Sequence, residues 1–323
     1  MSDIEALYRA VFAAPGDDGP RLVLADALQE RGDPRGEFIS LQLQNPRAQR
    51  SERRMQKLLE RHRSEFLRGL ASAVMPDATQ QWERGFLSEA SVVLSGDRVD
   101  TPDWATLKKL EVLFSGAPPF ELASPHMRSL KEITLAPLEA VPVLFAAPKP
   151  LRVEAVTLQG PPELGAWPDH DVALISEAAS LPSLQRLVLR CQTPNFTEAD
   201  WVWKMPLLTR LRSLEFQLLF RALPLPALLI RAREAELPPF AVVLHVSGAK
   251  LRFKRDDGYR SMVAELDGAN GVHLLEAMFK VIPIDLFDEL LVTSAQPLEI
   301  AQLASLKRAV KRLQLRNLSL PVR

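Results

Sequence analysis

Cysteine is almost absent from this sequence. The one cysteine, Cys191, can form no intramolecular disulfide, and it leaves too few thiolates for a cysteine-based structural zinc site. A chain without disulfides suits a reducing compartment, so we expect a cytoplasmic protein. P-loop, nucleophile-elbow, H-E-x-x-H and dinucleotide-binding motifs are missing as well. We therefore expect no catalytic residues, no cofactor, no metal site and a protein that is not an enzyme.

The sequence also has no excess of charge and no long apolar run. Its 40 Lys and Arg residues balance its 40 Asp and Glu residues, so no overall field draws the chain toward nucleic acid or membranes. No stretch approaches the roughly 18 apolar residues that span a bilayer. The N-terminus starts with acidic residues and lacks the basic region of a secretory signal. These absences predict that the protein has no membrane partner.

Glycine is scarce beside proline, with 14 glycines and 26 prolines, which predicts a chain that turns often. Helical periodicity is confined to the first 75 residues. Apolar spacing indicates a helix over Ile4–Ala13, prolines at first helical positions start helices at Pro20 and Pro34, and a fourth helix covers about 51–73. We expect residues 1–80 to form a helical module.

From Trp82 onward the period changes to a short repeated pattern, apolar-x-x-apolar-x-apolar. Its copies start at intervals of 20 to 31 residues, apart from one gap of 76. The copies are LSEASV at Leu87, LEVLFS at Leu110, LKEITL at Leu130, VEAVTL at Val153, LQRLVL at Leu184, LRSLEF at Leu211, FDELLV at Phe287 and VKRLQL at Val310. Such a period resembles that of leucine-rich repeats, whose strands place apolar residues inside and the intervening residues on an exposed sheet.

We therefore expect an irregular leucine-rich-repeat-like solenoid over residues 81–323. The long gap leaves room for another strand at "AVVLHV" and for an inserted hairpin within 241–265. The turns lack the Asn or Cys that regular leucine-rich repeats carry after the strand, which predicts irregular repeats. The hairpin can cover the sheet edge, so we expect a monomer.

The segment "PRLVLADALQERGDPRGEFISLQLQ", which starts at Pro20, resembles the bacterial repeat-companion domain, a helical module found ahead of repeats. The sequence departs from the usual Tyr and Trp of that family at Leu24 and Ala27. The signature residues are Asp26, Gly32, Asp33, Pro34, Arg35, Gly36 and Glu37. The resemblance implies an α+β solenoid in which the N-terminal helical module caps the repeat array, and it implies no reaction.

Four acidic residues in this signature, Asp26, Glu30, Asp33 and Glu37, admit two interpretations. They are suited to the acid–base chemistry of a hydrolase-type enzyme or to an oxygen-ligand metal site. The interpretation that we favour is structural. Asp33 caps a helix, Glu37 lies near a helix N-terminus, and the acids form ion pairs with Arg21, Arg31 and Arg35.

The segment 47–68 carries eight basic and three acidic residues, a local net charge of +5. Such a helix suits a nucleic-acid-binding protein, since it can contact phosphates. It lacks interleaved aromatic residues, so a solvated face or a contact to an acidic partner is the preferred interpretation.

The leading hypothesis is a non-enzymatic interaction protein, acting as scaffold, adaptor or inhibitor, that binds a protein partner through the exposed face of the repeat sheet. Nucleic-acid binding through the basic helix is the alternative, and the enzyme is the third. The residues expected to bind the partner are Glu111, Phe114, Glu132, Thr134, Glu154, Thr157, Arg186, Val188, Arg212, Glu215 and Arg312.

Overall fold

The computed structural model of the chain divides into two compact units. It describes residues 3–44, 49–76, 78, 80–94, 101–114, 124–147, 149–161, 166–191, 201–218, 241–246, 249–256, 259–266, 288–294, 304 and 313–316. Unit 1 comprises Met1–Glu154 and Ser180–Ser183, and unit 2 comprises Ala155–Ala179 and Leu184–Arg323. The division falls after Glu154, whereas the sequence suggested a boundary after residue 80.

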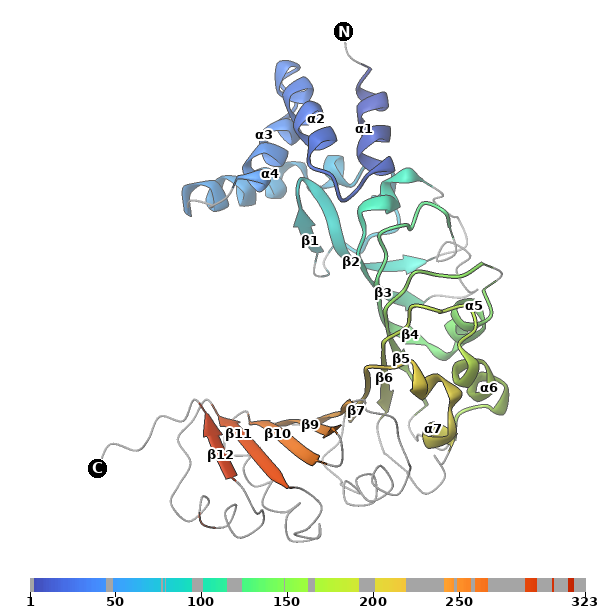
Figure 1. Cartoon of the computed structure of the whole chain (residues 1–323). Coiled ribbons are helices and arrows are strands. Elements are labelled where there is room, and N and C mark those ends of the chain that lie inside the picture. Colours follow the sequence, from blue (N-terminus) through green and yellow to red (C-terminus); the bar gives the residue numbers. More distant parts are fainter. Residues whose placement is uncertain are drawn as a thin grey trace, which may run out of the picture. The chain divides into compact units, whose positions relative to one another are not determined.

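Unit 1 begins with four helices, drawn in blue in Figure 1. They are α1 (Ile4–Ala13), α2 (Gly19–Glu30), α3 (Pro34–Leu43) and α4 (Gln49–Leu67), followed by a 3-10 turn, η1 (Arg68–Leu70). The predicted helices are therefore confirmed, and α4 ends earlier than expected. At that point Arg68 has a positive φ of 50°, which breaks the α-helical path.

Two clusters of buried side chains hold these helices to the strands that follow. Tyr8 and Phe12 of α1 pack edge-on against Phe86, and Phe38 of α3 packs between Phe66 and Trp82. Because the first strands contribute to both clusters, the helices and strands of unit 1 share one core. This sharing explains why the division into units falls beyond the helices.

The strands of unit 1 start with a tight hairpin. Arg84 and Gly85 form its two-residue turn with φ values of 51° and 83°, the left-handed pair that favours a right-handed hairpin twist. The strands are β1 (Gln80–Glu83), β2 (Phe86–Leu94), β3 (Lys109–Phe114) and β4 (Glu132–Pro137). β1 and β2 are antiparallel, and β2, β3 and β4 pair parallel in that order. The connections hold η2 (Pro102–Thr106), η4 (Leu138–Ala140) and α5 (Val141–Phe145).

Unit 2 continues with parallel strands and contains an antiparallel insertion. Its strands are β5 (Ala155–Gln159), β6 (Arg186–Cys191), β7 (Ser213–Leu218), β8 (Ala241–Val246), β9 (Ala249–Asp256), β10 (Tyr259–Leu266), β11 (Glu289–Ser294) and β12 (Leu313–Arg316). β5 to β8 pair parallel, β9 is antiparallel to both β8 and β10, and β10 to β12 are parallel again. The antiparallel pair β9–β10 falls where the sequence suggested an inserted hairpin.

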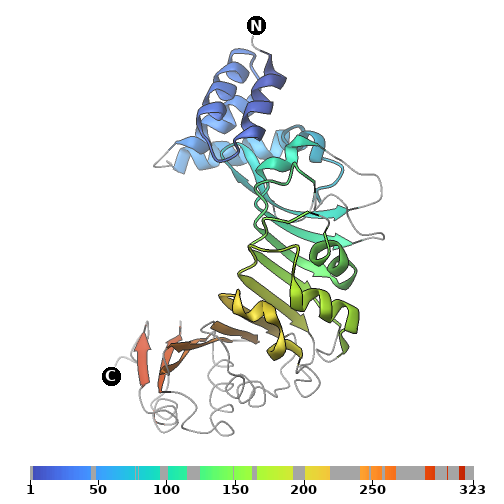
Figure 2. The same ribbon diagram turned by 45° about the vertical axis from the view of Figure 1, so that its right-hand side comes forward.

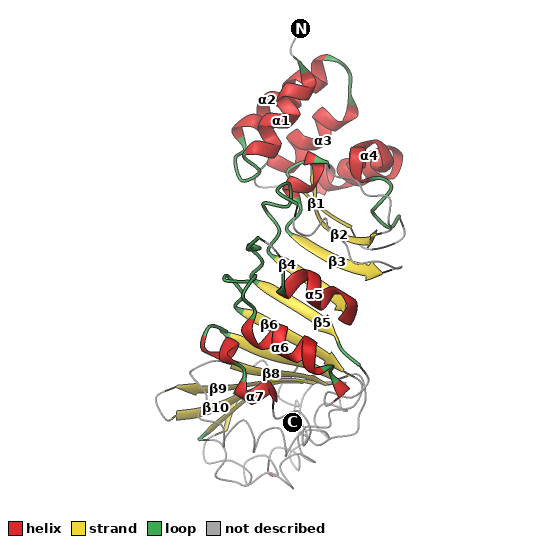
Figure 3. Ribbon diagram, turned by 90° about the vertical axis from the view of Figure 1, so that its right-hand side faces the viewer, coloured by secondary structure: helices red, strands yellow, loops and turns green. Residues whose placement is uncertain are grey.

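Short helices lie along one face of the first strands of unit 2 (Figures 2 and 3). They are α6 (Asp169–Glu177), α7 (Trp201–Lys204) and the 3-10 helix η6 (Pro206–Thr209). Trp203 of α7 contacts Phe216 of β7, with ring centroids 6.1 Å apart, so this face holds the core. The other face of the strands is the open face.

The chain is thus an α+β protein with N-terminal helices followed by a mostly parallel sheet arrangement. The copies of the repeated pattern all fall on or beside strands, and the strand expected at "AVVLHV" is β8. Among the helices of the described residues, none combines the length and apolarity needed to cross a bilayer.

Candidate functional site

The charged signature of the N-terminal module forms a helix-to-helix corner. Gly32 has a φ of 73°, and its N–H donates to the carbonyl of Gln29 while the N–H of Asp33 donates to the carbonyl of Leu28. These two bonds are a Schellman cap of α2. The Asp33 carboxylate then accepts from the N–H of Arg35 at 2.9 Å and caps α3, with Pro34 in the first turn. The capping role expected of Asp33 is confirmed.

Arg35 does not form the ion pair with neighbouring acids that the sequence suggested. Its side chain is buried, at 4% exposure, and donates to the carbonyl oxygens of Phe66 (2.6 Å) and Gly85 (3.3 Å). The guanidinium also lies 4.6 Å from the ring centroid of Phe86. Burial lowers its pKa from the ordinary value. Arg35 therefore joins α3, the end of α4 and the β1–β2 turn through carbonyls, a role that a local ion-pair count cannot reveal.

Arg21, likewise expected to pair with acids, is also buried and donates to the carbonyls of Asp17 (2.6 Å) and Pro15 (2.7 Å). Glu37 does form an ion pair, but with α4. Both of its carboxylate oxygens accept from Arg54, at 2.7 and 2.6 Å, and this bidentate contact lowers the pKa of Glu37.

The four acidic residues do not converge on a common point. Asp26 and Glu30 are exposed on α2, Asp33 is used in the cap and Glu37 pairs with Arg54. Within the part of the chain that the structure describes, no group of three or more His, Cys, Asp or Glu side chains is placed to hold a metal ion. The arrangement of the corner supports helix joining, and it shows no pair of carboxylates poised for acid–base chemistry.

The outer face of α4 is basic. Its inner face buries Met55, Leu58 and Phe66. Four cationic side chains are exposed at helical spacing on the outer face: Arg50, Arg53, Lys57 and Arg61. Among the described residues none of these four has an ion-pair or hydrogen-bond partner, whereas Arg54 pairs with Glu37 and Arg63 donates to the carbonyl of Pro76. The helix therefore presents a row of cations to solvent, which we call the α4 cation row.

In unit 1 the open face of the strands is the one opposite the buried Leu110, and the charged residues on and beside it pair with one another. Lys109 lies 3.8 Å from Glu89 and 3.7 Å from Glu132, and Lys131 bonds Glu154 at 2.8 Å. Glu111 accepts from the hydroxyl of Ser91. Thr134 is half-buried beside Glu111 in the strand register. The backbone of Phe114 ends β3, and its side chain lies outside the described part.

On the open face of unit 2, three of the expected contact residues are buried. Thr157, Val188 and Glu215 are consecutive partners in register, with exposed fractions of 6%, 1% and 7%. The expectation that they face solvent is wrong, because alternation assigns a residue to a face of the sheet but does not say whether other side chains cover it there. Arg186 is partly exposed and approaches Glu215 at 4.0 Å, and Arg212 is exposed. Arg312 lies outside the described residues.

A second row on the same face was missed from sequence. Two residues further along each strand, and therefore on the same side of it, the register aligns one polar residue per strand. We call these residues the polar row: Gln159, Arg190, Gln217, Lys250, Glu265 and Thr293, with position 245 of β8 between Gln217 and Lys250. All six named side chains are exposed or partly exposed. The signal in the sequence was the polar residue that directly follows VEAVTL, LQRLVL, LRSLEF and FDELLV.

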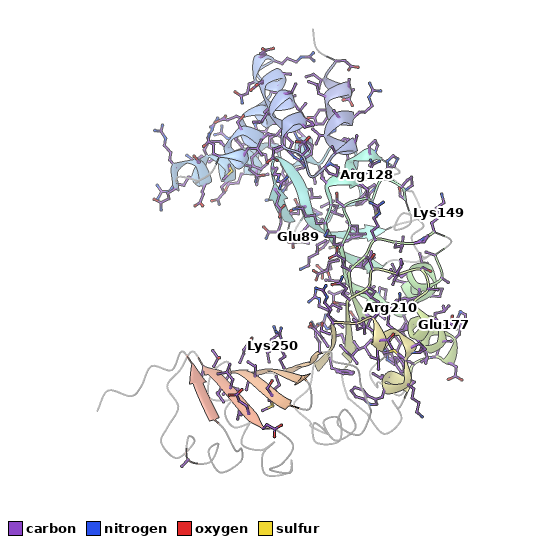
Figure 4. The ribbon with its side chains drawn as sticks, viewed as in Figure 1. Glu89, Arg128, Lys149, Glu177, Arg210 and Lys250 are labelled. Carbon is purple, nitrogen blue, oxygen red and sulfur yellow. The ribbon has the colours of Figure 1, made fainter. Side chains whose placement is uncertain are left out.

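Labelled side chains in unit 2 distinguish the two faces. Lys250 projects from the strands on the side away from Arg210 and Glu177, which lie beside the helices (Figure 4). Arg210 donates to the carbonyls of Glu177 (3.1 Å) and Ala178 (3.2 Å), so it holds the helix-covered side together. The polar row is thus on the open face.

No model of a protein family matches the chain, and no curated protein matches it. Among solved structures the chain is similar to a crystal structure of a Bacteroides fragilis protein from the Northeast Structural Genomics Consortium. The identity is 13%, the TM-score is 0.34, and the similarity covers 85% of each chain. At this level the similarity assigns neither a family nor an activity.

Proposed function

We propose that this protein is a non-enzymatic interaction protein that binds a protein partner through the open face of its strands. In this proposal the strands form an irregular leucine-rich-repeat-like solenoid, and the N-terminal helices are a repeat-companion module that caps it. The protein works as a monomeric scaffold, adaptor or inhibitor in a reducing, cytoplasmic setting. Its single cysteine is consistent with that setting.

The observation that carries the proposal is the polar row of unit 2. It aligns Arg190, Gln217, Lys250 and Glu265 on β6, β7, β9 and β10, with position 245 of β8 between Gln217 and Lys250, at a spacing of about 4.8 Å per strand. None of these side chains has a hydrogen-bond or ion-pair partner among the described residues, which supports their use in contacts to a partner. A rigid array of this kind binds with little loss of conformational freedom, which favours recognition.

The capping role rests on contacts within unit 1. Arg35 of α3 bonds the carbonyl of Gly85 in the β1–β2 turn, and Tyr8 and Phe12 cover Phe86 at the start of β2. The helices therefore bury apolar surface of the first strands, which a terminal repeat cannot bury alone.

Affinity capture from a native lysate, followed by mass spectrometry, tests the proposal when three forms of the protein are compared. Wild-type protein is expected to retain a specific protein, and the R190E/K250E double variant is expected to lose it. K204E is the matched control, since Lys204 is an exposed cation on α7 in the same unit. Retention by the double variant equal to that by wild type would show that the open face of unit 2 is not the binding surface.

Nucleic-acid binding through α4 is the second candidate, and the α4 cation row favours it. Arg50, Arg53, Lys57 and Arg61 lie on one exposed helix face with no partner among the described residues, as phosphate contacts require. Retention of the protein on heparin and on duplex DNA tests this function. If it operates, R53Q/K57Q/R61Q protein elutes at lower salt, and the slope of log Kd against log salt falls by about 0.9 per lost phosphate contact. Elution of wild-type protein without retention at low salt would remove the candidate.

A further inference from the structure

A hollow of about 370 Å³ lies in unit 1, apart from the polar row and the α4 cation row. Its walls are two short segments, residues 124–130 before β4 and residues 149–153 before β5. Its volume is within the range of small-molecule sites, about 300 to 1,000 Å³. Arg128 and Lys149 line the hollow, and both lie on the other side of the strands from Glu89 (Figure 4).

Both walls are held in place by backbone bonds. In the first wall, the N–H of Met127 donates to the carbonyl of Ser124 (3.1 Å), and that of Leu130 donates to the carbonyl of Met127 (3.3 Å). In the second wall, the N–H of Leu151 donates to the carbonyl of Ser180 (2.8 Å). Leu130 and Leu151 are buried, so each wall is anchored in the core. The hollow is therefore formed without a ligand, which lowers the entropic cost of binding.

The charged residues that line the hollow, among those the structure describes, are all cations. They are Arg128, Lys149 and Arg152. Within the described residues none of the three has a carboxylate partner, and the one side-chain bond among them runs from Arg128 to the carbonyl of Ala13 at 3.3 Å. Elsewhere in unit 1, Lys109 of β3 and Lys131 beside β4 pair with glutamates. Three cations at a concave surface, with no carboxylate partner among the described residues, attract anions.

Apart from Ser124, the rest of the described lining is apolar. Met127, Leu130, Leu151 and Val153 lie in the walls with Pro125 and Pro150. A fully hydrated inorganic anion gains nothing from such walls, whereas an organic molecule with a compact apolar or aromatic body gains their contact. Two guanidinium groups and one ammonium group suit a phosphate better than a single carboxylate, because together they offer more donors than one carboxylate accepts.

From this combination we propose that the hollow binds a small phosphomonoester whose phosphate contacts Arg128, Lys149 and Arg152 and whose apolar body lies against Met127 and Leu151. The site is independent of partner binding through the polar row. It makes the protein able to carry or sense a small phosphorylated molecule.

Isothermal titration of the full chain with phenyl phosphate, inorganic phosphate and phenol tests this site. We expect saturable binding of phenyl phosphate, weaker binding of inorganic phosphate and weaker binding of phenol. In K149Q/R152Q protein, affinity for phenyl phosphate is expected to fall at least about tenfold, since two charge-assisted hydrogen-bond donors to the phosphate are lost. R128Q is a second variant, and K204Q is the control, because it removes an exposed cation of α7 that lies in none of the proposed binding surfaces.

Several results would overturn the proposal. They are a lack of saturable phenyl phosphate binding, equal affinity of wild type and K149Q/R152Q, an equal loss in the K204Q control, and phenol binding as tight as phenyl phosphate. Both walls carry exposed cations at the mutated positions, so the variants are expected to fold, and their thermal melting curves verify it. Should R128Q melt early because its bond to Ala13 is lost, K149Q/R152Q still decides the matter.

Discussion

Individual residues of the N-terminal corner show how much of a local structure can be predicted from the helix-capping preferences of residue types. Gly32, Asp33 and Pro34 perform the roles that their types predict, because a left-handed glycine, a carboxylate cap and a first-turn proline act through bonds only a few residues apart. Arg35 could not be assigned in this way. Its partners are the carbonyls of Phe66 and Gly85, 31 and 50 residues away in the sequence. Only the folded unit brings them together.

Gly32→Ala tests the cap. The φ of 73° forces the new side chain into the left-handed region, which costs about 1–2 kcal/mol of unfolding free energy. Urea denaturation measures the change. Gly16→Ala is the matched control, because a Cβ there meets no atom within 4 Å, and its change is expected to stay within about 0.5 kcal/mol. Equal changes in the two variants would contradict the assigned role of Gly32.

The Glu37–Arg54 pair predicts a pH dependence. The bond to Arg54 lowers the pKa of Glu37 in the folded state below its unfolded value, which is about 4.3. The pair therefore contributes fully above that unfolded value, and its contribution is lost as pH falls through the lowered pKa. R54Q protein is expected to be less stable than wild type at neutral pH and equally stable in strong acid.

Urea denaturation across pH 2 to 7 measures this difference. R61Q serves as control, because Arg61 has no carboxylate partner among the described residues, and its difference from wild type should not follow the titration of Glu37. A stability difference for R54Q that persists unchanged into strong acid would show that the ion pair is not its source.

At the scale of elements, the periodicity of the sequence predicts the helices and strands well, and it predicts the exposure of individual strand residues less well. Alternation assigns each residue to one of two faces. It does not say whether neighbours in register cover an open-face residue. Val188 lies between Thr157 and Glu215 in register and is covered, whereas Arg190, two residues on, reaches solvent. Register is a property of paired strands and is therefore hidden in a single sequence.

Val188→Asp and Arg190→Asp compare the stability effect of a charge in the buried row of Thr157, Val188 and Glu215 with that of a charge in the polar row. The first places a carboxylate at a position that is 1% exposed, and it is expected to lower the unfolding free energy by at least about 2 kcal/mol. The second changes a partly exposed side chain, and its effect is expected to stay within about 0.5 kcal/mol. Thermal and urea denaturation measure both. A V188D protein as stable as wild type would mean that the row of Thr157, Val188 and Glu215 faces solvent after all.

At the scale of the whole molecule, a balanced total charge conceals local imbalance. The chain carries 40 cationic and 40 anionic residues, yet the α4 cation row and the phosphate hollow hold cations that no described carboxylate neutralises. The sequence made the first visible as a basic segment of one helix. It did not reveal the second, because Arg128 and Arg152 are separated in the sequence by a strand and a helix and line the same hollow only in the folded unit.

The central claim is that the polar row binds a protein partner, and the dissociation constant of the captured partner tests it most directly. Biolayer interferometry compares wild type, R190E/K250E and K204E. The account predicts at least about a tenfold weaker affinity for R190E/K250E, equivalent to 1.4 kcal/mol, and an unchanged affinity for K204E. Equal affinity of R190E/K250E and wild type, or a loss confined to K204E on the helix-covered side, would contradict it.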